Sequence, residues 1–233
     1  MFDLSPQDLR GPILGCGDGP ASFNSEATRR GTEVVSVDPM YRFSAEELRS
    51  RVTETAPVIA AELRKNADEF VWNHFESVDA LVAARLEAME TFLADYPHGR
   101  RVGRYVDAAL PELPFPDRRF RLALCSHLLF LYSEQLDFGF HVAALTELCR
   151  VADEVRVFPL LELGSRRSRH LDSATDALRS DGIDTRIVRV KYEFQKGGNE
   201  MLVVSKEADR AGRHAGPASG RQVAGALCAS TGR

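Results

Sequence analysis

The sequence lacks several features that would assign a class of protein at once. Its four cysteines, at positions 16, 125, 149 and 228, show neither the spacing of metal ligands nor a paired framework. It contains no run of about 18 apolar residues, so no membrane-spanning helix is expected. The net charge is −4, which gives no general attraction to nucleic acid. The N-terminus, Met1-Phe2-Asp3-Leu4, is acidic and too poor in apolar residues for a secretory signal. We therefore expect a cytoplasmic globular protein with buried, reduced thiols and no metal.

A glycine is also absent from an otherwise familiar turn. A short apolar run enters the loop Gly15-Cys16-Gly17-Asp18-Gly19-Pro20. The dinucleotide fingerprint G-x-G-x-x-G needs its third glycine five residues after the first, and proline stands there instead. A second apolar run, 33–37, ends on Asp38, where an acid can accept hydrogen bonds from ribose hydroxyls. The pairing predicts a nucleotide-like cofactor that is not a dinucleotide.

Strand and helix patterns alternate along most of the chain. A capping box at Ser44–Glu47 opens a helical insertion over 44–97, in which Pro57 predicts a break or kink. Residues 206–233 are poor in large apolar side chains, so we expect a disordered tail. Elsewhere the patterns predict strands at 11–15, 33–37, 104–108, 120–126 and 154–160, helices at 21–31, 133–150 and 172–181, and a final antiparallel hairpin of 186–194 with 201–205.

Three features together resemble a known family. The G-x-G-x-G loop resembles motif I of the class I S-adenosylmethionine-dependent methyltransferases. The stretch Leu113-Pro114-Phe115-Pro116-Asp117, followed by 120–127, is similar to that family's L-P-F-x-D segment and motif IV. The order of elements, ending in a hairpin, is the third feature. The resemblance covers 11–40 and 104–205. It implies an α/β, three-layer Rossmann-like sandwich over residues 1–205, with a seven-stranded, mostly parallel sheet, an antiparallel last strand and the helical insertion after strand two.

The resemblance also implies S-adenosylmethionine as cofactor and S-adenosylhomocysteine as product. Two positions depart from the family pattern. Ala109 stands where an acid usually holds the adenine amino group, so either Asp107, on the same strand face, or the backbone of 109–110 takes that role. Arg121 replaces an acid at the entry of its strand, away from the chemistry. The implied cofactor-binding residues are Gly15, Cys16, Gly17, Asp18, Gly19, Asp38, Pro39, Ala109, Leu110 and Ser126.

Fewer residues are candidates for binding or activating the methyl acceptor. His127 follows a strand directly and is the candidate base, with lining of the cofactor pocket as the alternative. Tyr132 could bond the acceptor or belong to the core. The aromatic patch of 70–75 could close over an acceptor or attach the insertion. The Arg-rich segment 166–170 could recognise an anionic acceptor or be a solvated loop.

The functional hypothesis is a methyltransferase acting on a small molecule by in-line methyl transfer. The insertion favours a small acceptor, since large insertions over a ligand site usually enclose substrates. One alternative is an RNA or protein methyltransferase that uses Arg100, Arg101, Arg104 and 166–170 as a contact surface. Another is a catalytically idle domain that binds cofactor or a partner protein. The sequence leaves the acceptor and the oligomeric state open.

Overall fold

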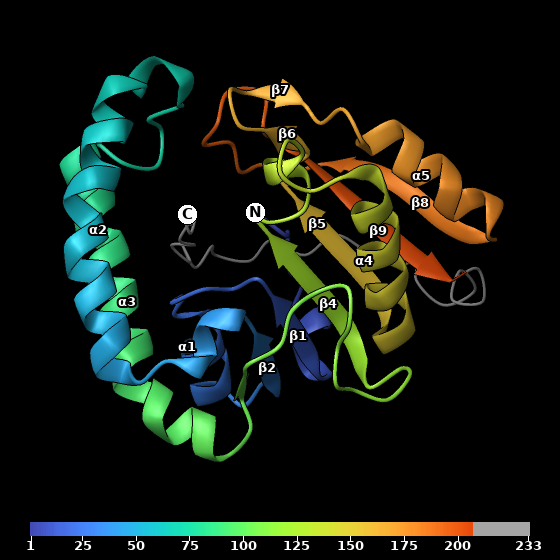
Figure 1. Cartoon of the computed structure of the whole chain (residues 1–233), viewed down its shortest axis with the longest axis horizontal. Coiled ribbons are helices and arrows are strands. Elements are labelled where there is room, and N and C mark those ends of the chain that lie inside the picture. Colours follow the sequence, from blue (N-terminus) through green and yellow to red (C-terminus); the bar gives the residue numbers. More distant parts are fainter. Residues whose placement is uncertain (207–233) are drawn as a thin grey trace.

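The structure, a computed structural model, describes residues 1–206 of the chain (Figure 1). Its centre is a seven-stranded sheet in the order β3-β2-β1-β4-β5-β9-β8, in which only β9 is antiparallel to its neighbours. This confirms the expected Rossmann-like sheet. Its strands are β1 (Ile13–Cys16), β2 (Val34–Val37), β3 (Tyr105–Val106), β4 (Phe120–Ser126), β5 (Ala152–Phe158), β8 (Ile183–Arg189) and β9 (Glu200–Lys206).

Alternating side chains of the central strands supply two cores, one on each face of the sheet. Leu14, Ala123 and Val155 pack on one face with the helices α4 (Phe138–Val151) and α5 (Leu171–Ser180). On the opposite face, Ile13 and Leu122 pack with the helix α1 (Phe23–Arg29) and with the N-terminal segment, which includes the short helix η1 (Asp8–Arg10). The period of two along each strand therefore produces the expected three layers.

The insertion consists of two long helices, α2 (Ala45–Lys65) and α3 (Val78–Arg101), joined through η3 (Ala67–Glu69). Both halves of the capping box form: the Glu47 amide donates to Ser44 Oγ (3.2 Å), and the Ser44 amide donates to Glu47 Oε2 (2.7 Å). The expected break at Pro57 is wrong, because α2 continues through it. Pro57 and Thr53 both lie on the exposed side of the helix. Water can therefore satisfy the Thr53 carbonyl, which a proline four residues later leaves without a donor.

The root of the insertion is fixed to the β2–β3 side of the sheet by a cluster of aromatic rings. Tyr41, Phe92, Tyr96 and Tyr105 pack on one another, each at most 3% exposed. Tyr41 lies in η2 (Pro39–Arg42), directly after β2. The Tyr96 hydroxyl is 2.8 Å from the carbonyl oxygens of both Tyr41 and Phe43, to which it donates. The insertion therefore starts from a rigid base.

Several boundaries differ from the sequence expectation. The helix expected at 133–150 begins at Phe138, after the short helix η4 (Phe130–Tyr132), because Asp137 caps it by accepting from the Phe140 amide (2.8 Å). The strand expected at 186–194 ends at Arg189, so a ten-residue connection, 190–199, joins β8 to β9. A small hairpin of β6 (Leu161–Glu162) and β7 (Arg166–Arg167) has no counterpart in the expectation.

The expected disordered tail lies outside the described residues, apart from Lys206 at the end of β9. Among residues 1–206, no helix combines the length and hydropathy needed to cross a bilayer.

Candidate functional site

The carboxyl ends of the central parallel strands meet at one edge of the sheet. Cys16, the last residue of β1, is in register with Val37 of β2 on one side and with Cys125 of β4 on the other. Ser126 of β4 is in register with Phe158 of β5. The strand order reverses around β1, and ligands of open α/β sheets bind at such a point. The loops after these strands form the candidate site.

The glycine loop after β1 needs its glycines for separate reasons. Gly17 and Gly19 have φ values of +68° and +59°, a region that glycine enters without strain. A Cβ on Gly17 would also lie 2.8 Å from Leu128 Cδ2. Gly15 has no such φ, but a Cβ there would lie 1.9 Å from Asp18 Oδ2, because the Asp18 side chain folds back over it. A larger residue would therefore collide with a neighbouring side chain at Gly15 and Gly17 and would be strained at Gly19.

Asp38 joins the glycine loop to the end of β2. Its Oδ2 accepts from the Gly19 amide (3.0 Å) and its Oδ1 accepts from the Met40 amide (2.9 Å), which caps η2. From the other side, the Tyr41 hydroxyl donates to the Gly19 carbonyl (2.8 Å). Burial raises the pKa of Asp38, although the two amides oppose the rise. The structure thus brings the loop and the acid together, and each carboxylate oxygen can still accept another hydrogen bond.

A second carboxyl group is buried in the same loop. Asp18 is 6% exposed, and its Oδ2 accepts from Ser36 Oγ of β2 at 2.5 Å. Burial raises the pKa of Asp18 to about 7; the Ser36 hydrogen bond opposes the rise, and the nearby charge of Asp38 adds to it. Sequence reasoning placed Asp18 at the cofactor loop and missed Ser36. The signal was a lone hydroxyl in the apolar run Val34-Val35-Ser36-Val37.

Cys16 lies beneath this loop and is buried against Cys125. The hydrogen bond with Cys125 and burial raise the pKa of the Cys16 thiol well above its usual range. A buried thiol with a raised pKa is unreactive, so Cys16 serves here as a small apolar residue.

Ser126 and His127 lie where β4 ends. His127 has φ = +52°, and its amide donates to the Phe158 carbonyl (2.8 Å). Ser126 Oγ lies 2.6 Å from His127 Nδ1 and 3.3 Å from Met1 Sδ. Burial, followed by the positive charges of Arg85 and the N-terminal ammonium, lowers the pKa of His127 to about 4. The imidazole is therefore neutral at neutral pH. The structure places Tyr132 five residues further on, in η4, with its side chain partly buried.

The residues after β3, expected to bind the adenine, differ in how exposed their side chains are. Leu110 is 7% exposed and its side chain packs in the core, whereas Ala109 is exposed and its carbonyl accepts from the Glu112 amide (3.2 Å). Asp107 forms an exposed ion pair with Arg42 (3.6 Å). Pro39 is exposed at the start of η2. At 109–110 the Ala109 side chain faces outward and the Leu110 side chain is taken up by the core, so the roles expected for Asp107 and for the backbone of 109–110 stay predictions.

The tip of the insertion reaches across to the connection between β8 and β9. The Val71 amide donates to the Phe194 carbonyl (2.6 Å), and the Lys196 amide donates to the Glu69 carbonyl (2.9 Å). The Phe194 ring stacks on Phe70 at 4.8 Å between centroids and meets Trp72 and Phe75 edge-on. Of the two readings of the aromatic patch, attachment of the insertion therefore describes these three rings. Figure 1 shows the α2–α3 pair extending from the β2 side toward β6 and β7.

A further ring of the tip faces toward the end of β4. His74 stacks on Tyr192 at 5.1 Å, Tyr192 lies 6.0 Å from Phe158, and Phe158 lies 6.0 Å from His127. These four rings contact one another in sequence, from His74 of the insertion to His127, the candidate base. Sequence reasoning placed Tyr192 in a loop at this end of the sheet but missed Phe194, which lies in the same connection between β8 and β9.

The three arginines of the segment 166–170 all form ion pairs with acids of the same chain. Arg166 and Arg169 pair with the buried Glu162 (3.2 and 2.9 Å). Arg167 pairs with Asp172 and Glu200 (both 3.1 Å). Of the other arginines considered as a contact surface, Arg104 is directed inward, where it pairs with Asp95 (2.7 Å). These pairs favour a structural role for this stretch over recognition of an anionic acceptor.

Among the described residues, no group of three or more His, Cys, Asp or Glu side chains is arranged to hold a metal ion. The site therefore offers the buried acid Asp18 of the glycine loop, the partly buried acid Asp38 after β2 and a neutral imidazole at the end of β4. The insertion and the β8–β9 connection add aromatic rings.

No protein-family model matches the chain. Among solved structures it is similar to a SAM-dependent methyltransferase from Methanosarcina mazei, at 13% identity over 88% of this chain and 98% of that one, with a TM-score of 0.44. It is also similar to magnesium protoporphyrin IX methyltransferase from Synechocystis PCC 6803 with bound SAH, at 13% identity over 84% of this chain and 73% of that one, with a TM-score of 0.43. Similarity at this level concerns the course of the chain and carries no information about substrate.

The strand order and the single reversed strand are those of the Rossmann-like fold that the sequence resemblance implied. The chain is 32% identical, over 88% of its length and 90% of the relative's, to the uncharacterized protein MJ0045 from Methanocaldococcus jannaschii. It belongs to the same family as that protein.

The attachment of the insertion tip can be tested by truncating its central ring. Phe194→Ala removes the contacts with all three tip rings, so we expect faster amide hydrogen exchange across 66–77, with exchange in β1 and β4 unchanged. Phe138→Ala is the matched control, because that ring is 43% exposed. Unchanged exchange over 66–77 in Phe194→Ala would show that these rings do not hold the tip.

The pH dependence of stability tests the environment of His127. The folded pKa of about 4 lies below the ordinary value of 6.5, so the unfolded chain binds a proton first as the pH falls. Wild-type protein should therefore lose about 2 kcal/mol more stability between pH 7 and pH 5 than His127→Asn. Asparagine is suitable because it tolerates positive φ. Urea unfolding at the two pH values gives the comparison, and parallel losses in the two proteins would contradict the assignment.

Proposed function

We propose that this protein is an S-adenosylmethionine-dependent methyltransferase. The observation that carries the proposal is the hydrogen bond from the Gly19 amide to Asp38 (3.0 Å), made at the point where the strand order of this fold reverses. It holds a glycine-rich loop and a carboxylate side by side. Glycines without a Cβ let a ligand approach the backbone, and the carboxylate can accept from ribose hydroxyls.

The charge of the site fits this cofactor. S-adenosylmethionine carries a sulfonium and an ammonium group, and two acids lie close together here, Asp18 in the glycine loop and Asp38 directly after β2. Within the described residues neither acid forms an ion pair. The remaining cofactor-binding positions that we propose are Gly15, Cys16, Gly17, Pro39, Ser126 and the backbone of Ala109 and Leu110, all of which lie at the carboxyl edge of the sheet.

His127 is the candidate general base. When bound, the cofactor would supply a methyl group, and the electron pair of the bond that breaks would stay on the sulfur, which loses its positive charge. His127 is neutral and, when Nδ1 donates to Ser126 Oγ, the lone pair of Nε2 remains available for a proton from the acceptor. In that arrangement the Ser126 hydrogen is directed to Met1 Sδ, so Ser126 would fix the tautomer. Tyr132, in the short helix η4 that follows β4, is our second candidate for hydrogen bonding to the acceptor.

We infer a small-molecule acceptor from the insertion. It is attached at its root by the buried cluster around Tyr96 and at its tip by the rings around Phe194. An insertion attached at both ends passes over the carboxyl edge of the sheet and restricts entry to the site. A bulky RNA or folded protein would need a more open approach.

Calorimetry with S-adenosylmethionine and S-adenosylhomocysteine tests the cofactor. Wild-type protein should bind both, and Asp38→Ala should weaken binding by about tenfold or more, since hydrogen bonds to a charged group contribute about 1.5–3 kcal/mol. Glu33→Ala is the matched control, an exposed acid at the opposite end of the same strand, and should bind as wild type. Failure of the wild type to bind either compound would falsify the proposal.

Catalysis is tested by S-adenosylhomocysteine formation with a panel of small alcohols, amines and carboxylic acids. For any acceptor with a proton to lose, His127→Asn should lower kcat by about 10²–10⁴-fold while the Kd of the cofactor stays unchanged. Tyr132→Phe should raise KM if its hydroxyl binds the acceptor. An unchanged kcat in His127→Asn would show that His127 is not the base and only lines the cofactor pocket. Absence of turnover with cofactor bound would favour a binding domain without activity.

A further inference from the structure

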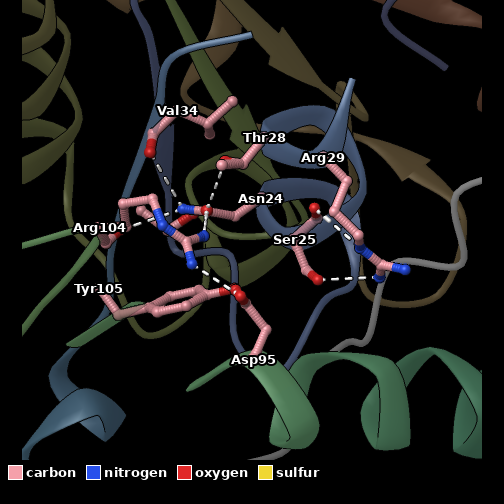
Figure 2. Close-up of polar contacts among 9 residues, drawn as sticks. Asn24, Ser25, Thr28, Arg29, Val34, Asp95, Arg104 and Tyr105 are labelled. Carbon is pink, nitrogen blue, oxygen red and sulfur yellow. Dashed lines mark hydrogen bonds and ion pairs between the residues drawn. The ribbon is translucent and has the colours of Figure 1, made fainter. Parts of the chain in front are cut away.

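A buried chain of hydrogen bonds leads from the insertion to the glycine loop. Arg104 Nη1 donates to Asn24 Oδ1 (2.7 Å), and Asn24 Nδ2 donates to Ser36 Oγ (3.1 Å). The Ser36 hydroxyl then donates to Asp18 Oδ2 at 2.5 Å. Asn24, Ser36 and Asp18 are 1%, 0% and 6% exposed, so water does not compete with these bonds. The first part of this chain is shown in Figure 2.

The far end of the chain is fixed by an ion pair. Arg104 pairs with Asp95 of α3 at 2.7 Å, and the Tyr105 hydroxyl donates to the other oxygen of Asp95 (2.9 Å). Asn24 Nδ2 also donates to the Arg104 carbonyl (3.0 Å), which fixes the orientation of its amide (Figure 2). Asn24 therefore cannot rotate its amide without losing bonds on both sides.

All donors in the chain point toward Asp18. Because Ser36 Oγ accepts from Asn24, its own hydrogen is directed to the Asp18 carboxyl, an arrangement suited to a carboxylate. The surroundings of Asp18 otherwise oppose a negative charge. The titratable groups nearest to it are Cys16 of β1, Asp38 at the end of β2 and Tyr41 of η2, and none of them is a cation. Asp18 is thus provided with donors for the charged form but not with a countercharge.

We propose that the cofactor's positive charge supplies this countercharge, so that Asp18 gives up a proton to solvent when S-adenosylmethionine binds. Ser36, Asn24 and Arg104 are positioning residues that set how readily the proton leaves. This inference rests on the proposed function and goes beyond it, because it assigns a proton stoichiometry to binding and a role to residues that do not touch the ligand.

The sign of the pH effect follows from the linkage. If the complex holds fewer protons than the free protein, the affinity rises with pH up to the pKa of free Asp18, about 7, and then levels off. The slope below that pKa approaches about tenfold per pH unit. At pH 7 the release should be near half a proton per cofactor bound, and at pH 6 it should be larger.

The experiment is titration calorimetry of the full chain with S-adenosylmethionine at pH 6, 7 and 8. Each titration is run in two buffers of different ionisation enthalpy, so that the difference in heat gives the protons released. The ligand's own amino group titrates near pH 8, with a pKa of about 7.7–8.0 for a free α-amino group. The readout is therefore the difference between wild type and Asp18→Asn, which should bind without the release and without the rise in affinity below pH 7.

Ser36→Ala separates positioning from mere structural support. Its hydroxyl lowers the pKa of Asp18, so its loss should raise that pKa, shift the levelling-off of affinity to higher pH and bring the release at pH 7 closer to one proton. Thr28→Val is the matched control, because it removes a hydroxyl that only donates to Asn24 Oδ1 (3.4 Å); its pH profile should match wild type.

The possible outcomes are distinct. Wild-type binding with the same proton release as Asp18→Asn, or a Ser36→Ala profile that does not move, overturns the proton exchange and leaves the methyltransferase proposal intact. No binding at any pH overturns the proposed function itself. If Asp18→Asn does not fold, wild type against Ser36→Ala decides the question.

Discussion

The hydrogen bonds of Asp38 are the constraint on which the rest of the site depends. One carboxylate accepts from the Gly19 amide and from the Met40 amide, and so ties the glycine loop to the first turn of η2. Gly19 can present its amide there because its φ of +59° is open to glycine. The insertion starts a few residues after Met40. The cofactor loop, the end of β2 and the root of the insertion therefore share a single anchor.

A buried acid, Asp18, beside a partly buried one, Asp38, without a cation between them is costly for a folded protein. Asp38 is relieved by backbone amides and Asp18 by the hydroxyl of Ser36. The nearest compensating charge on the chain side is Arg104, separated from Asp18 by two intervening side chains. The remaining imbalance is greatest in the empty protein and falls when a cation enters. On the proposed function, a site built in this way would favour a positively charged ligand over a phosphate, which agrees with a loop that lacks the glycine of the dinucleotide fingerprint.

The features predicted correctly from the sequence are those encoded locally. The glycine spacing, the acid after β2, the capping box at Ser44 and the exact span of β4 all depend on neighbouring residues, and the structure has them. The features that were missed depend on residues far apart in the chain. Phe194 and Phe70 are in contact although more than a hundred residues separate them in the sequence. The sequence of the tip does not indicate which ring it will contact. Pro57 does not end the helix, because the effect of a proline depends on whether water reaches the freed carbonyl, and that helix face is exposed.

The two attachments of the insertion differ in strength, and this bears on how an acceptor enters. At the root, Tyr41, Phe92 and Tyr96 are at most 1% exposed, and the Tyr96 hydroxyl binds two carbonyls. At the tip, Phe70, Trp72 and Phe194 are only partly buried, and two backbone hydrogen bonds accompany them. Since buried apolar area dominates the free energy of such contacts, the tip is the weaker attachment. The tip also carries His74, whose ring leads through Tyr192 and Phe158 to His127. An opening at the tip would therefore separate His74 from Tyr192 and leave the glycine loop and Asp38 in place, since these are held at the root.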